Sequence, residues 1–320
     1  MNNCQYNSHF SEHIRNLLEL RAAMGRHVKT LAYQLQSFDR FCIKHYPEEK
    51  SLIRELATDW CSECESGSGS GYSYRMYTMR TLGKYIVSLG QTAFVFPSEW
   101  IAKPKAGLPY IFSDEELKLF FAAADTIKPS FYRASHMREY TIPVIFRLML
   151  GCGLRPQEAR RLKRNEVNIH DGKLCINASK GNMDRVLPIS ADLINICRNY
   201  DRIFDIVYPD REYFFQCPKG KPYRATWITA QFHRCRELAG GIAPNSTPYD
   251  FRHNFATRTL MRWAEEGKDF GVWLPYLSTY MGHVVYSSTA CYVHLLPERL
   301  SRCDFTKING IIPEVSHEQA

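Results

Sequence analysis

The stretch TPYDFRHNFATRTLMRWAEEGKDFGVWLPYLSTYMGHVVYSSTACYVHLL, residues 247–296, decides the interpretation of this chain. It contains an arginine (Arg252), a histidine (His283) and a tyrosine (Tyr292), which short predicted helices can bring together. An arginine can bind a phosphate, a histidine can stabilise extra charge on it, and a tyrosine can attack it. This chemistry needs no cluster of metal ligands.

Phosphoryl transfer spreads additional negative charge over the non-bridging oxygens in the transition state, so catalysis depends on positioning and on positive donors. Arginine suits this task because its planar fork stays charged and binds two oxygens at once. A tyrosine can act as the covalent nucleophile if a neighbouring group eases loss of the phenolic proton, which ordinarily leaves near pH ~10. Such an enzyme stores the bond energy as a phosphotyrosine.

A second arginine lies in the segment GCGLRPQE, residues 151–158. The segment follows an apolar, helix-like run at 142–150 and precedes a polar helix start, with Pro156 at the first helical position. Arg155 is therefore predicted at a turn into a helix.

A lysine is predicted at the tip of a β-hairpin. The strand-like segments 174–178 and 185–189 flank Lys180 and Gly181. The spacing predicts a hairpin that carries Lys180 at its turn.

The order Gly-Leu-Arg-Pro-x-Glu, hairpin lysine, x-Asp-x-Arg-His, Gly-His and tyrosine resembles the tyrosine recombinases, also called the phage integrase family. The separation of His283 from Tyr292 (292 − 283 = 9) also resembles the family's spacing. The motifs extend from Arg155 to Tyr292. Each motif alone is weak, whereas all of them in this order are a strong signal.

The resemblance implies a role for each matching residue. Arg155 and Arg252 correspond to the two arginines that clamp the scissile phosphate. Lys180 corresponds to the lysine that protonates the leaving 5′ oxygen. His283 corresponds to the histidine or tryptophan that hydrogen-bonds a non-bridging oxygen, and Tyr292 to the nucleophile that forms a 3′-phosphotyrosyl bond.

One position departs from the family pattern. Three residues before Arg252, where the family has a histidine, this chain has Tyr249. A phenol can hydrogen-bond but is a poorer base near neutral pH, so the identity of the base stays open. Glu158 and His253 match recurring positions of the family and are predicted to orient or brace the arginines.

Length and composition favour a folded chain of two domains. The chain has 320 residues, of which 45% are hydrophobic and 23% charged. We predict a mainly α-helical fold with a small β-sheet (α+β). It comprises a helical core-binding domain (1–96), a basic Pro/Gly linker (97–111), a catalytic domain (112–300) and a C-terminal tail (301–320). The net charge of +8 suits a polyanionic partner such as nucleic acid.

Apolar stripes at three-to-four spacing predict successive helices over residues 9–90, with a flexible Ser/Gly loop at 66–71 before the fourth helix. That helix mixes tyrosines with basic residues. The alternative is an ordinary amphipathic helix with half-buried tyrosines and solvated arginines. Together with the downstream motifs, DNA contact is favoured, and the residues predicted to contact phosphates are Arg75, Arg80, Lys84, Lys103 and Lys105.

Further helix signals lie in the catalytic region. Ser113 to Glu116 is predicted to form a capping box, and residues 225–238 are predicted to form a helix. Asp250 is predicted to cap the helix that carries Arg252.

No apolar segment typical of a signal peptide opens the chain, and no apolar run reaches the ~20 residues that span a membrane. The 11 cysteines are scattered in a chain without a predicted secretory signal, which favours reduced thiols and a cytoplasmic location. The family resemblance implies that the protein acts there on DNA. Cys61 and Cys64 form one Cys-x-x-Cys without a second pair, so two thiols on one helix face are expected rather than a metal site. No metal and no cofactor are predicted.

The resemblance implies a site-specific DNA recombinase or integrase that works through a transient 3′-phosphotyrosine without metal or ATP. Its partner is double-stranded DNA with a specific recombination site, and two partner duplexes imply a tetramer on DNA. The resemblance also leaves room for an accessory DNA-bending or directionality factor. Two alternatives stay open. The first is a topoisomerase that reseals the original strand, and the second is a non-catalytic DNA-binding regulator in which Tyr249 is a sign that the catalytic site has degenerated.

Overall fold

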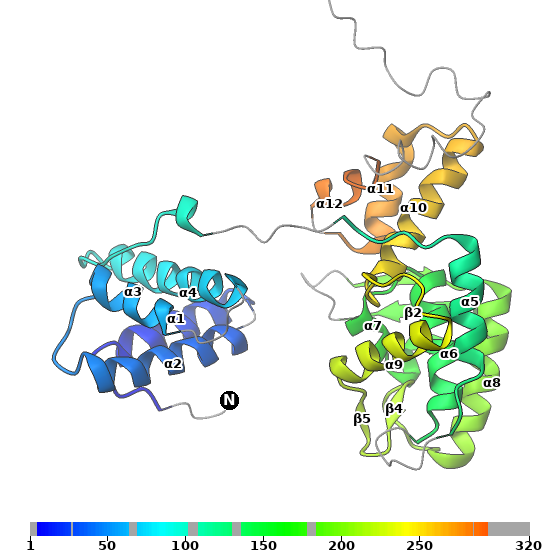
Figure 1. Cartoon of the computed structure of the whole chain (residues 1–320), viewed down its shortest axis with the longest axis horizontal. Coiled ribbons are helices and arrows are strands. Elements are labelled where there is room, and N and C mark those ends of the chain that lie inside the picture. Colours follow the sequence, from blue (N-terminus) through cyan, green and yellow to red (C-terminus); the bar gives the residue numbers. More distant parts are fainter. Residues whose placement is uncertain are drawn as a thin grey trace, which may run out of the picture. The chain divides into compact units, whose positions relative to one another are not determined.

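A computed structural model describes residues 5–26, 28–63, 69–101, 108–129, 136–177, 184–283 and 285–293. The chain divides into two compact units, Met1–Gly107 and Leu108–Ala320 (Figure 1). Each unit has a hydrophobic core of its own.

The N-terminal unit consists of helices, as the periodicity predicts. Its elements are α1 (Ser11–Ala23), α2 (Lys29–His45), α3 (Arg54–Ser62), α4 (Gly69–Ser88) and the short 3-10 helix η1 (Ser98–Trp100). The aromatic core includes Phe38 and Trp60, whose ring centroids lie 5.4 Å apart. The loop predicted at 66–71 is corrected in part, because α4 already begins at Gly69. Residues 66–68 lie outside the described residues.

A buried carboxylate fixes the segment that leads into α1. Asp39 on α2 accepts hydrogen bonds from the backbone N–H groups of Asn7 and Ser8, both at 3.0 Å, and from the Ser8 hydroxyl. Buried N–H groups without a partner are costly. Asp39 therefore joins the start of the chain to α2.

We expect Asp39→Ala to destabilise the docking of α1 by about 1–3 kcal/mol, because it leaves these donors unpaired. Native-state hydrogen exchange should show faster exchange of the α1 amides, with the α4 amides unchanged. Asp39→Asn, which keeps one acceptor oxygen, should show a smaller effect. Equal exchange of α1 in wild type and Asp39→Ala would contradict this role.

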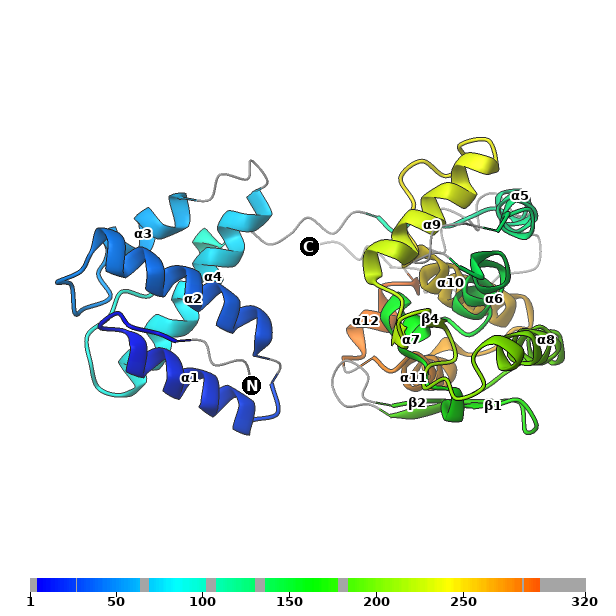
Figure 2. The ribbon, with the colours of Figure 1, turned by 90° about the horizontal axis from the view of Figure 1, so that it is seen from below.

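The C-terminal unit is a helical body with two small sheets, which is the α+β arrangement predicted. Helix α6 packs against both α5 and α8 and lies between them in Figure 2. The helices are α5 (Asp114–Asp125), α6 (Arg138–Gly151), α7 (Pro156–Arg161), η3 (Arg164–Glu166), α8 (Ala191–Val207), α9 (Ala225–Leu238), α10 (Asp250–Glu265), α11 (Phe270–Met281) and α12 (Ser287–Ala290).

The larger sheet is antiparallel with the order β1-β2-β3. Its strands are β1 (Val167–Asn168), β2 (Lys173–Ile176) and β3 (Arg185–Pro188), and Ile176 pairs with Arg185. The second sheet pairs β4 (Gln216–Cys217) with β5 (Lys221–Pro222). The strands β2 and β3 form the two arms of the predicted hairpin, whereas Lys180 itself lies outside the described residues.

Phe251 is the centre of an aromatic core that positions the start of α10. Its ring lies 5.1 Å from that of Phe120, 5.4 Å from that of Phe232 and 5.9 Å from that of Phe146. These rings come from α5, α9 and α6. Because Phe251 directly precedes Arg252, this packing fixes where the arginine enters the interior.

The helix-start signals are partly confirmed. Ser113 and Glu116 form the capping box, and Pro156 is the first residue of α7. The predicted cap at Asp250 is wrong, because Asp250 is itself the first helical residue and Tyr249 precedes it without a capping bond from its side chain. The carboxylate of Asp250 instead accepts from the Thr247 N–H at 2.6 Å. It thereby stabilises the turn before the helix.

Within the described part of the chain, no helix has both the length and the apolar character that crossing a bilayer requires.

Candidate active site

Helix α11 ends at a glycine whose backbone conformation is left-handed. Gly282 has φ 62°, and the N–H groups of Gly282 and His283 bond back to the carbonyls of Thr279 and Ser278, each at 3.0 Å. Glycine adopts this conformation without the steric cost that a Cβ brings. The turn exposes the last carbonyls of the helix and directs the chain into His283.

Three arginines bind three successive carbonyls at this helix end. The carbonyls of residues 280–282 accept hydrogen bonds, in that order, from Arg185 Nε (2.8 Å), Arg252 Nη2 and Arg155 Nη2 (2.8 Å). The final carbonyls of a helix have no intrahelical partner and form the negative end of its dipole. The C-terminus of α11 therefore gathers three positive charges that are far apart in the sequence.

Glu158 holds two of these arginines from the other side. One carboxylate oxygen lies 2.6 Å from Arg155 Nη1, and the other lies 2.8 Å from Arg185 Nη2. The Glu158 side chain is only 7% exposed. Burial alone would raise its pKa, but the hydrogen bonds and charges of Arg185 and Arg155 outweigh it and lower the pKa of the Glu158 carboxyl.

Arg252 is fully buried. Its Nη1 donates to the Gly153 carbonyl at 2.7 Å, while its Nε has no hydrogen-bond partner within the described part of the chain. Burial, followed by the charge of Arg155, lowers the pKa of Arg252 to about 10. The guanidinium thus remains charged near neutral pH.

Tyr292 lies beside this cluster and is 2% exposed. Its hydroxyl oxygen is 2.8 Å from Nδ1 of His253, the residue that follows Arg252 on α10. Burial raises the pKa of Tyr292 above its ordinary value, although Arg252 opposes the shift. The phenol is therefore protonated near neutral pH in this state.

His283 also lies next to the Tyr292 ring. The rings of His283 and Tyr292 are stacked at 6.3 Å with an interplanar angle of 17°. His283 Nδ1 lies 2.7 Å from the buried hydroxyl of Thr289. Burial, and then the charges of Arg252 and Arg155, lower the pKa of His283 to about 4, so the imidazole is neutral.

Tyr249 is at the margin of the site. It is 39% exposed, and its ring centroid lies 5.0 Å from that of His253. The structure thus brings together Arg155, Arg252, His283 and Tyr292, with Tyr249 near enough to influence the pKa of Tyr292. Lys180, Lys103 and Lys105 lie outside the described residues.

The expected roles in bracing and DNA contact stay predictions, and the structure shows which groups these side chains contact. The described hydrogen bond of His253, which we expect to orient the arginines, is to the Tyr292 hydroxyl. In the N-terminal unit, Arg75 donates to the Trp60 carbonyl and Arg80 to the Phe96 carbonyl, so both guanidiniums bind their own unit. Lys84 is exposed on α4.

Arg185 and Thr289 contact the site, although none of the family motifs includes them. A signal for Arg185 was present, because side chains alternate along a strand and Arg185 shares its phase with the buried Leu187. A charged residue on the inward face of a strand requires a buried partner, and Glu158 is that partner. Thr289 has no comparable signal, since only the turn after α11 brings it to His283.

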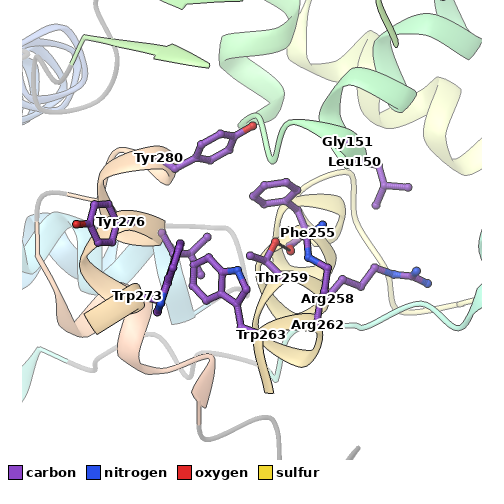
Figure 3. A pocket seen from close by; sticks show the side chains of 11 residues that line it. Leu150, Gly151, Phe255, Arg258, Thr259, Arg262, Trp263, Trp273, Tyr276 and Tyr280 are labelled. Atoms are coloured by element: carbon purple, nitrogen blue, oxygen red, sulfur yellow. Dashed lines mark hydrogen bonds between the residues drawn. The ribbon is translucent and has the colours of Figure 1, made fainter. Parts of the chain in front are cut away.

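One cavity of the C-terminal unit lies away from these residues. About 660 Å³ of space lies between α10 and α11, and its lining contains none of the candidate catalytic residues (Figure 3). Trp263 and Trp273 face each other there at 5.4 Å, and Tyr280 stacks on Phe255 at 5.2 Å. Among the described residues, no group of three or more His, Cys, Asp or Glu side chains is arranged to hold a metal ion.

The buried Glu158 gives a stability prediction. Glu158→Gln keeps the shape but removes the charge between two largely buried guanidiniums, so we expect a loss of about 3–5 kcal/mol in the free energy of unfolding. Urea unfolding followed by circular dichroism measures it. Asp125→Asn is the matched control, because the Asp125–Arg147 pair leaves Asp125 50% exposed and should contribute less than about 1 kcal/mol.

The effect should also depend on pH. Because the folded-state pKa of Glu158 is lowered, its contribution is fully present above the ordinary carboxyl pKa and is lost as the pH falls through the folded value. The stability difference between wild type and Glu158→Gln should therefore narrow in acid. A difference that stays constant down to the folded-state pKa would contradict the ion-pair interpretation.

Comparison with known proteins extends over most of the chain. Residues 111–299 match the model of the Phage integrase family. The putative integrase/recombinase y4rB of Sinorhizobium fredii is 28% identical over 299 residues, which cover 91% of this chain and 94% of that protein. Tyrosine recombinase XerA of Pyrococcus horikoshii is 25% identical over 304 residues, which cover 92% of each.

A solved structure has the same fold. The XerH site-specific recombinase, in a post-cleavage complex with palindromic difH substrate, matches 91% of this chain and 83% of its own with a TM-score of 0.63 at 19% identity. The family match covers more than half of the chain and includes the arginines, histidines and tyrosine gathered at the end of α11. This chain belongs to the phage integrase family, the tyrosine recombinases.

Proposed function

We propose that this protein cleaves and rejoins DNA at a specific recombination site through a 3′-phosphotyrosine at Tyr292, without a metal ion or ATP. As a member of its family the chain is a tyrosine-type DNA recombinase. The observation that carries the finer proposal is the convergence of the Tyr292 hydroxyl, His283 and the two arginines around one helix end.

The positive groups suit a bound phosphodiester. Arg155 and Arg252 both carry guanidinium donors, and hydrogen bonds to backbone carbonyls position both side chains before any substrate binds. Preorganised donors stabilise developing charge without reorganisation during the reaction. We assign them to the non-bridging oxygens of the scissile phosphate.

His283 can add a neutral donor. When the Thr289 hydroxyl donates to Nδ1, the ring carries its hydrogen on Nε2. That N–H is then the group with which His283 would bind a non-bridging oxygen.

In the proposed cleavage step the Tyr292 oxygen attacks phosphorus, and the bond from phosphorus to the 5′ oxygen breaks. The leaving 5′ oxygen takes a proton, for which the hairpin residue Lys180 is the candidate donor. Rejoining is the reverse attack by a free 5′ hydroxyl. If that hydroxyl belongs to a partner duplex, strands are exchanged, and we therefore propose a tetramer on DNA with one site for each strand.

The N-terminal helical unit is proposed to hold the duplex. Its exposed Lys84 and the chain's net charge of +8 favour contacts with the phosphate backbone. Such contacts position the protein without reading sequence.

Tyr292→Phe should abolish covalent attachment to DNA. Duplexes are first selected from a random pool by binding, then nicked so that the cleaved end diffuses away, and incubated with protein in EDTA. A denaturing gel should show a covalent protein–DNA band with wild type and none with Tyr292→Phe, because the phenyl ring lacks the attacking oxygen.

Tyr286→Phe is the matched control, because Tyr286 is an exposed tyrosine six residues earlier (292 − 286 = 6). It should keep the band. No band from wild type on DNA that it binds would refute the cleavage activity, and a band that persists in Tyr292→Phe would identify a different nucleophile.

A further inference from the structure

We propose that His253 is the catalytic residue that accepts the phenolic proton of Tyr292, a task for which the family pattern would use the position that Tyr249 occupies here. The inference rests on the proposed function of Tyr292 as the nucleophile. It is carried by geometry, because His253 touches the atom that must lose a proton.

The imidazole is held in place for this contact. Nδ1 of His253 lies 2.8 Å from the Tyr292 hydroxyl oxygen, within the range required of a general base. The two residues that precede His253 are both fixed. Arg252 donates hydrogen bonds to two backbone carbonyls, and Phe251 packs in the aromatic core. The backbone that carries His253 therefore has little freedom to move the ring away.

Its protonation state is suitable. Burial lowers the pKa of His253, Asp250 opposes the shift and the neighbouring Arg252 adds to it. A neutral imidazole with its hydrogen on Nε2 leaves Nδ1 free to accept the phenolic hydrogen. The tyrosine needs such an acceptor, because its own burial keeps the phenol protonated.

The other two candidates are less well placed. Tyr249 contacts the His253 ring and is 39% exposed. Its phenol is a weak base near neutral pH. His283 stacks on the face of the Tyr292 ring and uses Nδ1 for Thr289. His253 is the histidine with a hydrogen bond to the nucleophilic oxygen.

The proton is accounted for in both directions. As the Tyr292 oxygen forms its bond to phosphorus, its hydrogen passes to His253 Nδ1, which becomes an imidazolium. The bond to the 5′ oxygen breaks, and that oxygen receives its proton from a separate donor. In rejoining, the imidazolium returns the proton to the tyrosine oxygen as the phosphotyrosyl bond breaks.

The groups that face His253 influence its pKa, and its protonation in turn should affect the cleavage rate. They are Asp250 and Arg252 on α10, Tyr249 before that helix, and Tyr292 and His283 from the segment after α11. Since the pKa of His253 is lowered, the neutral form predominates near neutral pH and disappears as the pH falls through that value. Cleavage by wild type should therefore decline on the acid side.

The decisive variant is His253→Asn, whose amide oxygen can still accept a hydrogen bond near the position of Nδ1 but does not take up a proton. Under single-turnover conditions on the nicked duplex, we expect covalent attachment to be about 10²–10⁴-fold slower than wild type. The acid limb of the pH profile should flatten, while the Kd for DNA, measured by gel shift, stays the same. Added imidazole should restore part of the rate of His253→Ala.

A substrate with sulfur in place of the bridging 5′ oxygen separates the two proton transfers. A thiolate leaves without protonation, because thiols have a pKa of about 8.5. His253→Asn should remain slow on this DNA. Recovery of the wild-type rate would mean that His253 serves the leaving group, which would overturn the proposal.

His170→Asn provides a matched control, because His170 is an exposed histidine between β1 and β2. It should cleave like wild type. A wild-type rate and pH profile in His253→Asn, in a preparation whose Tyr292→Phe variant is inactive, would overturn the role of His253 alone. Absence of any adduct with wild type would instead refute the proposed function, and this inference with it.

Discussion

The unpaired carbonyls at the C-terminus of α11 are the constraint on which the candidate active site depends. Every helix ends with carbonyls that lack an intrahelical partner. Here the left-handed Gly282 leaves three of them to be bound by arginines that come from a strand, a helix start and a long helix. One backbone feature thereby sets the mutual positions of groups spread over more than a hundred residues, and His283 follows it directly.

Burying so much positive charge requires compensation. Glu158 supplies a carboxylate shared by Arg155 and Arg185, whereas the described hydrogen bonds of Arg252 go to backbone carbonyl oxygens. Charged groups removed from water are stable only when their hydrogen bonds are satisfied. Among the described residues, Arg252 Nε is the group of this guanidinium that lacks a hydrogen-bond partner.

Burial and the neighbouring positive charge together set the protonation of the adjacent rings. Burial is the larger cause, and with the charge of Arg252 it lowers the pKa of both His253 and His283, which keeps the imidazoles neutral next to Tyr292. A neutral imidazole can accept one proton and donate another, depending on its tautomer. One of these neutral histidines lies within hydrogen-bond distance of the Tyr292 hydroxyl, and the other is stacked with the Tyr292 ring.

The sequence by itself determined the helical character, the hairpin strands, the capping box at Ser113 and the order of the family motifs, because these depend on local periodicity and spacing. It did not determine the start of α10, the partners of Arg75 and Arg80, or the membership of Arg185 and Thr289 in the site. Only the tertiary structure decided that His253 contacts the Tyr292 hydroxyl. The physical reason is that hydrogen bonds between distant segments depend on how the helices pack, and no local pattern encodes them.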